Sequence, residues 1–295
     1  MWDRGYDQMI ANIKERFGFE LELFNTGGWC MVYEAKLEGN VVIWISDYDA
    51  GVTPREERLL LEGTHLLQEA LKLGLRLDLV VATPDWIARH EPLWQGLSAR
   101  TRLQAATAEV LAAVATTRSP DGVVASAELP CLPISATPSF VLALDRLQDP
   151  GNLGTLLRTA LAAGVEQVWL ADSADPHAPK VLRASSGAAL ALPVQRLDRQ
   201  GLRDCLEEAG QAGLQRLATQ VGAGQPYWQL DWSRPTVLLL GNEGAGLAEE
   251  LAALADHRVT IPHSPAVESL NVAVAAAPLL LERWRQRGGA TASAT

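Results

Sequence analysis

Short apolar runs alternate with helix-forming segments through the second half of this chain, and this alternation limits the fold more than any other feature. Buried strands are expected at Phe140–Leu144, Gln167–Ala171, Gln215–Ala218 and Thr236–Leu240, and helices at Gly154–Ala163, Gln200–Gly210 and Glu268–Arg287. Such alternation is typical of βαβ units around a mostly parallel sheet. The sequence therefore predicts an α/β domain over residues 136–287.

Three further segments surround this domain. A proline-rich stretch, Leu129–Pro138, separates it from a smaller α/β unit over residues 54–135, because proline neither continues a helix nor donates to a central strand ladder. Residues 1–53 predict an α+β extension of unassigned role, with one helix at residues 7–17 and strands at 19–24, 29–37 and 41–45. Residues 288–295 are expected to form a disordered tail.

Composition limits the compartment and the chemistry. The chain has 295 residues, of which 48% are hydrophobic, and no apolar run reaches the length of a membrane helix. Its first residues lack both the basic start and the apolar stretch of a secretory signal. The three cysteines form no CxxC pair, which argues against a disulfide framework and a zinc site. We expect a cytoplasmic protein that uses neither a membrane nor a metal.

Net charge argues against nucleic acid at first sight. The formal charge is -10, and so acidic a chain is unusual for a partner of the phosphate backbone. However, residues 1–53 carry 4 basic and 9 acidic groups, so half of the net charge lies in the N-terminal extension. Any RNA contact must depend on local basic clusters, for which the candidates are Arg55/Arg58, Arg100/Arg102 and Lys180/Arg183.

Ligands of parallel sheets bind beyond the carboxyl ends of the strands, which directs attention to the loops after Leu144, Leu240 and Ile261. The first loop carries Asn152 and, six residues later, Arg158, a cation available to an anion at the mouth of a site. The second begins Gly241-Asn242-Glu243-Gly244, where the missing glycine side chain lets a ligand approach the backbone. The third places Ser269 and Asn271 at the start of an alanine-rich helix.

Together these loops resemble the three motifs of the SpoU (TrmH-type) RNA 2'-O-ribose methyltransferases, a family of the SPOUT superfamily. The resemblance rests on Asn152–Arg158, on Gly241–Gly244, and on Ile261-Pro262 with Glu268–Val272, in that order along the chain. It extends from about residue 54 to residue 287, and the smaller unit is similar to the ribosomal-protein-like RNA-binding domain that often precedes the catalytic domain. His263 and Pro265 depart from the family, which often has methionine and glycine there.

The resemblance implies a fold, a cofactor and a set of site residues. The C-terminal chain would form a trefoil knot, and S-adenosylmethionine would bind in the knotted loops. The implied cofactor-binding residues are Leu240, Gly241, Asn242, Ile261 and Leu270. Arg158 would be catalytic with Asn152 as its companion, and Glu243, Ser269 and Asn271 would shape the catalytic pocket. Members usually form homodimers with the active site at the subunit interface.

The chemistry that the resemblance implies suits these residue types. Methyl transfer to a ribose hydroxyl needs alignment and loss of the hydroxyl proton, and it needs no metal. A guanidinium is a poor proton acceptor, so we favour a role for Arg158 in binding the adjacent phosphate and stabilising the developing alkoxide. Glu243 could instead only cap a helix, and Lys180 and Arg183 could be ordinary surface charges.

Two classes of function therefore remain open from the sequence. The first is an S-adenosylmethionine-dependent methyltransferase acting on a ribose 2'-hydroxyl of structured RNA, with ribosomal RNA favoured over transfer RNA because of the two-domain layout. The second is an RNA-binding protein that keeps the fold without the activity. The order of glycines after Leu240 is not GxGxxG, which disfavours a nicotinamide dehydrogenase.

Overall fold

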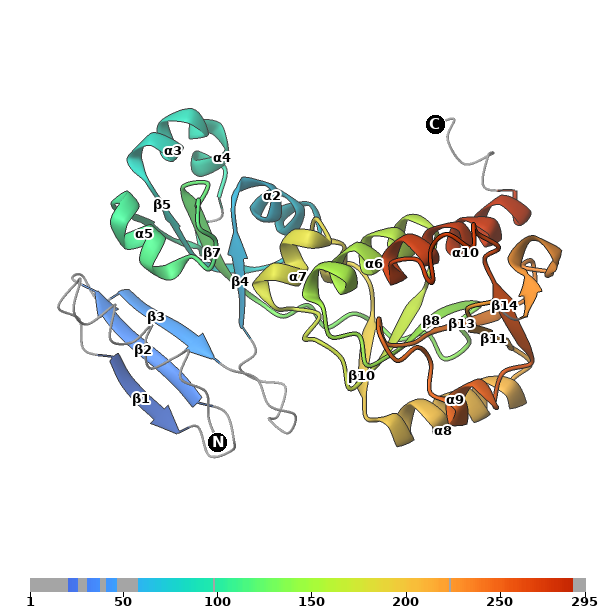
Figure 1. The fold of residues 1–295 in the computed structure, drawn as a ribbon. Helices are drawn as coiled ribbons and strands as arrows, with labels where there is room; N and C mark the ends of the chain where they lie inside the picture. Colours follow the sequence, from blue (N-terminus) through green and yellow to red (C-terminus); the bar gives the residue numbers. More distant parts are fainter. Residues whose placement is uncertain are drawn as a thin grey trace. The chain divides into compact units, whose positions relative to one another are not determined.

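The computed structural model describes three strands of the N-terminal region and residues 58–97, 99–222 and 224–288. The chain divides into two compact units, residues 1–57 and 58–295. In the first unit β1 (Leu21–Asn25), β2 (Met31–Leu37) and β3 (Val41–Ser46) form an antiparallel sheet in that order (Figure 1). The helix predicted at residues 7–17 lies outside the described residues.

The second unit begins with a small four-stranded sheet of order β4-β7-β5-β6. Its elements are β4 (Arg58–Glu62), α2 (Thr64–Lys72), β5 (Leu77–Ala82), α3 (Pro84–Arg89), α4 (Glu91–Gln95), β6 (Arg102–Ala105), α5 (Ala108–Val114) and β7 (Val123–Glu128). Strand β7 runs antiparallel to both of its neighbours, whereas β5 and β6 are parallel. We call residues 58–128 the small domain.

A seven-stranded sheet follows, of order β10-β9-β8-β13-β11-β14-β12, and each described pairing in it is parallel. Its strands are β8 (Phe140–Asp145), β9 (Gln167–Ala171), β10 (Val194–Leu197), β11 (Gln215–Thr219), β12 (Gln225–Pro226), β13 (Thr236–Leu240) and β14 (His257–Thr260). Its helices are α6 (Pro150–Ala162), α7 (Pro179–Ala184), α8 (Arg199–Gln211), α9 (Glu249–Ala252) and α10 (Val272–Gln286), with 3-10 turns at Ala188–Leu190 and Tyr227–Gln229. The predicted parallel α/β sheet is confirmed, while the knot and the boundaries at residues 53 and 135 stay predictions.

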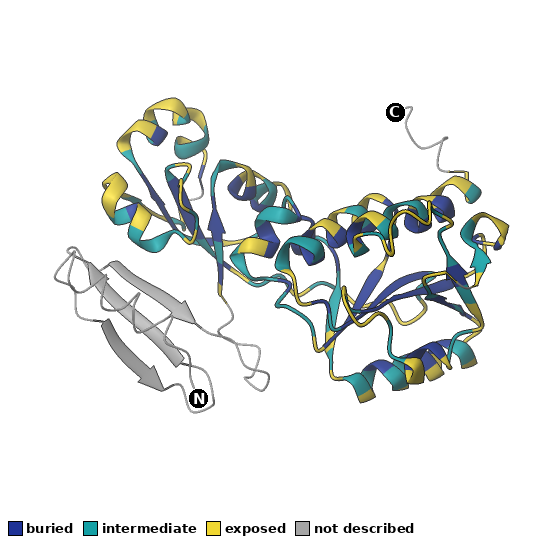
Figure 2. Cartoon of the chain, in the orientation of Figure 1, coloured by how far each residue is buried: buried dark blue, intermediate teal, exposed yellow. Residues whose placement is uncertain are grey.

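Both faces of this sheet are covered, which explains its continuous apolar strands. In β8, Phe140, Leu142 and Leu144 join one buried cluster with residues of α6 and α10, while Val141 and Ala143 join a second cluster with residues of α8. Figure 1 shows α6 and α10 on one side of the strands and α8 with α9 on the other. Figure 2 shows that the central strands are buried along their length. The sheet is therefore a rigid support for its edge loops.

Two helices begin at places other than the sequence predicts. Helix α6 starts at Pro150 rather than Gly154, because Asp149 accepts a hydrogen bond from the N–H of Asn152 (2.8 Å) and proline suits the first turn. Helix α10 starts at Val272 rather than Glu268, because the side chain of Asn271 caps it. Strands β4, β6, β10, β12 and β14 were not predicted as strands. Strands β6, β10, β12 and β14 have four residues or fewer, and β6 and β10 are largely exposed or half-buried, whereas β4 has five residues of which three are buried.

Among the residues that the structure describes, no helix combines the length and the apolar character that crossing a bilayer requires.

Candidate active site

The first site loop joins β8 to α6 and is held in an unusual backbone conformation. Arg146 has a φ of 56°, a left-handed conformation that a residue with a side chain adopts at a cost. Its N–H donates to the carbonyl of Ala171 (2.9 Å), and its carbonyl accepts from Asn242 Nδ2 (2.8 Å). Two neighbouring strand ends therefore fix the turn from which α6 starts.

The second loop follows β13 and folds back on itself around Asn242. Asn242 and Gly246 exchange both backbone hydrogen bonds, at 3.0 and 2.9 Å, and Asn242 Oδ1 accepts from the N–H groups of Gly244 and Ala245, each at 2.9 Å. A Cβ added to Gly241 would lie 2.2 Å from the backbone nitrogen of Leu247. Glycine is required here because the loop's own backbone fills that space, whereas the sequence suggested the approach of a ligand.

Glu243 ties this second loop to the first. Its Oε1 accepts from the N–H of Asp149 (3.2 Å) and from Asn152 Nδ2 (3.3 Å). Its Oε2 accepts from the N–H of Gln148 and from Asn242 Nδ2, both at 3.4 Å. Glu243 therefore contacts the N-terminal region of α6, and four N–H groups face its two oxygens. Only a carboxylate can accept on both sides, which gives this residue a more specific role than capping the following helix.

The third loop completes the cluster through Asn271. Its Oδ1 accepts from the N–H groups of Ala273 (2.9 Å) and Val274 (3.3 Å), which leaves its Nδ2 to donate to Asn152 Oδ1 (2.9 Å). Asn152 must then direct its own Nδ2 toward Glu243. The orientation of both amides follows from the α10 cap, and a directional chain of hydrogen bonds joins the three loops. We call Asn152, Glu243 and Asn271 the motif cluster.

Arg158 lies apart from the motif cluster. It is exposed on α6, and it makes no hydrogen bond or ion pair with any residue that the structure describes. Six residues of helix place it about 9 Å along the axis and about 120° around it from Asn152. The structure therefore brings together Asn152, Glu243 and Asn271 and leaves Arg158 on another side of the same helix, available to a phosphate.

The predicted cofactor-binding residues lie at the same strand ends. Leu240 and Gly241 are buried, and Ile261 and Leu270 are half-buried, so apolar side chains and accessible backbone meet beyond β13 and β14. Ser269 is exposed between them. His263, a departure from the family, hydrogen-bonds through Nδ1 to the carbonyl of Ile261 (2.7 Å). This set of apolar side chains and backbone groups suits an adenosine-containing cofactor.

Cations proposed for RNA fall into different environments. Arg58 pairs with Asp78, and Arg183 pairs with Glu62 at 3.1 Å. Lys180 is 63% exposed and lies 3.9 Å from Asp149, a weak surface pair. Arg102 is exposed on β6, and Arg100 is also exposed. Arg55 lies outside the described residues. Of the described cations, Arg100, Arg102 and Lys180 are exposed, whereas Arg183 is held by a buried carboxylate.

A buried carboxylate at the end of β8 escaped the sequence analysis. Asp145 is fully buried, and its Oδ1 accepts from Arg199 Nη2 (3.2 Å), while its Oδ2 lies 3.4 Å from Arg146 Nε. Burial alone would lower the pKa of Arg199, but the charge of Asp145 and its hydrogen bond, together with the charges of Glu250 and Asp172, outweigh burial and raise that pKa. The Asp145–Arg199 pair therefore fixes the residue that directly precedes the turn at Arg146. The sequence signal that could have identified this residue is an acidic side chain directly after the apolar run Phe140–Leu144.

Within the described part of the chain, no group of three or more His, Cys, Asp or Glu side chains is arranged to hold a metal ion.

Comparison with known proteins agrees with this geometry. The family model described as the SpoU rRNA Methylase family matches residues 139–281, and the model of an MRM3-like substrate binding domain matches residues 54–125. An uncharacterized tRNA/rRNA methyltransferase of Synechocystis sp. is 45% identical over 241 residues, which cover 80% of this chain and 87% of that protein. The 23S rRNA (guanosine(2553)-2'-O)-methyltransferase RlmP of Bacillus subtilis is 35% identical over 75% of this chain and 86% of its own length.

Solved structures agree as well. The AdoMet-bound rRNA methyltransferase from Sinorhizobium meliloti superposes with a TM-score of 0.65 at 33% identity, covering 77% of this chain and 87% of that one. A parallel sheet with three motif-bearing loops at its carboxyl edge, preceded by a substrate-binding domain, defines an RNA-modifying methyltransferase. The chain belongs to the SpoU rRNA methylase family.

Proposed function

We propose that this protein transfers a methyl group from S-adenosylmethionine to the 2'-hydroxyl of a ribose in structured RNA. The observation that carries the proposal is the motif cluster, in which Asn152 from the first turn of α6, Glu243 from the loop after β13 and Asn271 from the start of α10 join by direct hydrogen bonds. An ordered arrangement of these loops is what alignment of a cofactor with a hydroxyl requires. Relatives whose names specify 2'-O-methyl transfer support the same reaction.

The proposed roles follow from the environment of each residue. Bound S-adenosylmethionine would supply an electrophilic methyl group, and Leu240, Gly241, Asn242, Ile261 and Leu270 would hold it at the ends of β13 and β14. The motif cluster would keep the three loops in register, with Ser269 exposed at their edge.

Arg158 would act on the RNA rather than on the proton. Its guanidinium would bind the phosphate beside the target ribose and stabilise the negative charge that develops on the 2'-oxygen. The hydroxyl proton would pass to that phosphate or to water as the oxygen–carbon bond forms. The absence of an acidic partner for Arg158 among the described residues supports this role, because a paired guanidinium would first have to be released.

Ribosomal RNA is the substrate class that we favour over transfer RNA. The layout of a small substrate-binding domain followed by the catalytic domain matches relatives named as 23S rRNA methyltransferases over most of their length. An enzyme acting on ribosomal RNA works where that RNA is, and we accordingly propose a cytoplasmic protein. Mapping 2'-O-methyl sites in ribosomal and transfer RNA from a strain lacking this gene would identify the nucleotide, and a missing methyl group in transfer RNA alone would refute the preference.

We also propose that the enzyme is a homodimer. Val274, Leu281 and Trp284 recur on one side of α10 and are 61%, 46% and 41% exposed, and Leu161 of the adjacent α6 is 39% exposed. Apolar side chains grouped on packed helices favour a protein partner, here a second copy of this chain. Because Arg158 is on the exposed side of α6 with Leu161, a second copy would let it reach the motif cluster of its partner.

Substitutions of Arg158 test the catalytic proposal. Arg158→Ala and Arg158→Lys should lower the rate of RNA methylation while leaving the affinity for S-adenosylmethionine, measured by calorimetry, within about twofold of the wild type. If affinity falls as far as turnover, Arg158 is a cofactor-binding or structural residue. If the wild-type protein fails to bind S-adenosylmethionine at all, the chain is an RNA-binding protein without this activity.

A further inference from the structure

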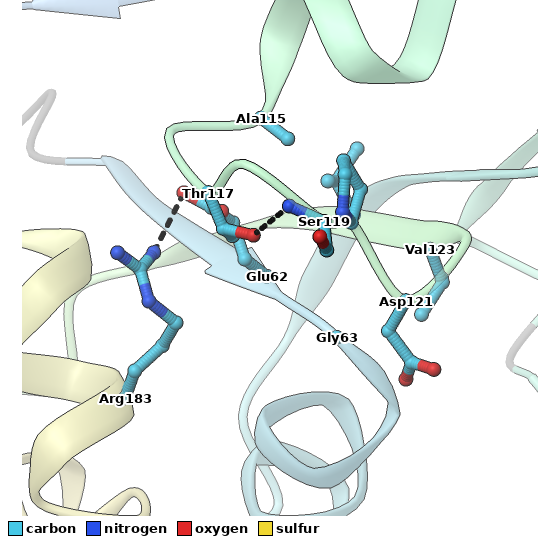
Figure 3. A pocket seen from close by; sticks show the side chains of 10 residues that line it. Glu62, Gly63, Ala115, Thr117, Ser119, Asp121, Val123 and Arg183 are labelled. Atoms are coloured by element: carbon cyan, nitrogen blue, oxygen red, sulfur yellow. Dashed lines mark hydrogen bonds and ion pairs between the residues drawn. The ribbon is translucent and has the colours of Figure 1, made fainter. Parts of the chain in front are cut away.

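A buried carboxylate of the small domain is paired with a cation of the methyltransferase domain. Glu62, at the end of β4, has a side chain only 2% exposed, and its Oε1 lies 3.1 Å from Nη1 of Arg183 on α7. The same oxygen accepts from the N–H of Thr116 (3.1 Å) and from its hydroxyl (2.6 Å). Figure 3 shows Arg183 reaching from α7 toward Glu62, at the edge of a pocket of about 140 Å³.

Glu62, Thr116 and Arg183 each contact the other two. Arg183 Nη1 also donates to the hydroxyl oxygen of Thr116 (2.9 Å), so cation, hydroxyl and carboxylate form a triangle. Glu62 Oε2 is buried and accepts no hydrogen bond from the described residues, so the charge of Glu62 is compensated through Oε1 alone. A buried carboxylate is costly unless it is paired and hydrogen-bonded. Moving Arg183 away from Glu62 would leave this buried carboxylate without its cation, so the pair favours one arrangement of the two domains.

Helix α7, which carries Arg183, also contacts α6, the helix that carries Asn152. Helix α7 packs closely on α6, because a Cβ added to Gly154 would lie 2.5 Å from the Cβ of Ala184 and 2.8 Å from the carbonyl of Val181. Gly154 lies two residues after Asn152 on α6. The position of α7 therefore determines where the helix that carries Asn152 and Arg158 can lie.

A second contact supports the first. Gly187, after α7, has a φ of 83°, and a Cβ added there would lie 3.0 Å from the Cβ of Glu69 on α2. Buried side chains of α2 and α7, including Leu66 and Val181, belong to one continuous hydrophobic cluster that extends across both sheets. The small domain thus meets the methyltransferase domain through an ion pair and an apolar contact side by side.

We propose that the Glu62–Arg183 pair is a positioning device that holds the small domain in one orientation on the methyltransferase domain, so that RNA bound by the small domain presents its target ribose to α6. This inference rests on the proposed function and names Arg183 as a positioning residue rather than an RNA contact. Lys180, one turn earlier on α7, differs in being mostly exposed and only weakly paired. The two cations of one helix would therefore have separate tasks.

The first test measures orientation and needs no RNA. Spin labels at Ala112→Cys on α5 and Glu208→Cys on α8, both exposed, would report the distance between the two domains in a background whose native cysteines are replaced by serine. We expect one narrow distance distribution in the unsubstituted pair and a broad one in Arg183→Gln. Arg203→Gln, which removes an exposed pair with Glu207 on α8, is the matched control and should leave the distribution narrow.

The second test separates positioning from binding. Arg183→Gln should lower kcat on structured RNA by about 10- to 100-fold, because small misplacements of reacting groups have such effects, while the Kd for RNA changes by less than about twofold. Arg183→Lys, which can still donate to Glu62, should recover most of the lost rate. Glu62→Gln should act like Arg183→Gln. It provides a second variant if Arg183→Gln fails to fold, since it leaves no unpaired buried carboxylate and the charge of the partly exposed Arg183 can be solvated.

Two outcomes would overturn the proposal. An unchanged distance distribution in both Arg183→Gln and Glu62→Gln would show that the pair does not hold the domains. Weaker RNA binding in Arg183→Gln with a smaller salt dependence and unchanged distances would identify Arg183 as a phosphate contact instead. Failure of the proposed function is distinguishable, because it would appear as inactivity of the wild-type protein and would leave the distance measurement interpretable.

Discussion

Replacing Glu243 by glutamine tests the motif cluster with almost no change in size. Four N–H groups face the two oxygens of Glu243, at 3.2 to 3.4 Å. An amide group can accept on only one side, so Glu243→Gln must turn an NH₂ toward two N–H donors whichever way the side chain is placed. The substitution therefore removes two hydrogen bonds and a negative charge while keeping the shape of the residue.

The size of the effect follows from these contacts. A hydrogen bond to a charged group contributes about 1.5–3 kcal/mol when well formed, but these contacts are long and Glu243 is exposed, so we expect a total of about 1–2 kcal/mol. Whichever way the amide is turned, at least one lost bond joins the β13 loop to the region between β8 and α6, so the substitution should loosen the loops that would hold the cofactor. The Kd for S-adenosylmethionine should rise about 5- to 30-fold.

Calorimetry with S-adenosylmethionine is the direct assay, with melting temperature measured in parallel. Glu208→Gln, an isosteric change on the exposed side of α8, is the control and should leave both values unchanged. The melting temperature of Glu243→Gln should fall by no more than a few degrees, because the residue is at the surface. A Kd within twofold of the wild type, with normal melting, would refute the argument that a carboxylate is required.

Three other predictions concern the loops, the dimer and the fold. Gly241→Ala should sharply lower the melting temperature, because its Cβ would collide with backbone at 2.2 Å, whereas Gly244→Ala, whose nearest contact is at 3.6 Å, should melt like the wild type; equal melting would contradict the packing described for this loop. Leu281→Glu should shift a dimer to a monomer by light scattering, and an unchanged mass would exclude the proposed α10 interface. Hydrogen bonds from Arg216 lower the pKa of the Asp256 carboxyl, and the stability gained above the unfolded value of 3.8 is lost as pH falls through the folded value. Asp256→Asn should therefore lower the melting temperature more at pH 7 than at pH 3, and an equal loss at both would contradict this pairing.

Strand and helix order in the catalytic domain was predictable because its signals are local. Buried runs such as Phe140–Leu144 and Thr236–Leu240 carry enough apolar residues to be recognised alone, and both are strands in the structure. Helix starts were less predictable. The capping residues Asp149 and Asn271 decide them, and each cap competes with other polar residues close by in the sequence.

Contacts between distant loops could not be predicted from residue patterns. The spacing of the motifs identified Asn152, Glu243 and Asn271 as candidates, but their hydrogen bonds span 91 and 119 residues and depend on the strand order β8–β13. The pairing of Glu62 with Arg183 likewise depends on how the small domain meets α7. The close approach at Gly241 was predicted, but its occupant, the backbone of the same loop, was not.

Transfer of a labelled methyl group from S-adenosylmethionine to ribosomal RNA, followed by alkaline hydrolysis, tests the central claim most directly. Alkali cleaves RNA through the free 2'-hydroxyl, so a 2'-O-methyl group protects the adjacent bond. The account predicts that the label is recovered in alkali-resistant dinucleotides and that Arg158→Ala abolishes most of it. Label recovered in mononucleotides would mean methylation of a base, and no incorporation into any RNA would mean that the chain is not a methyltransferase.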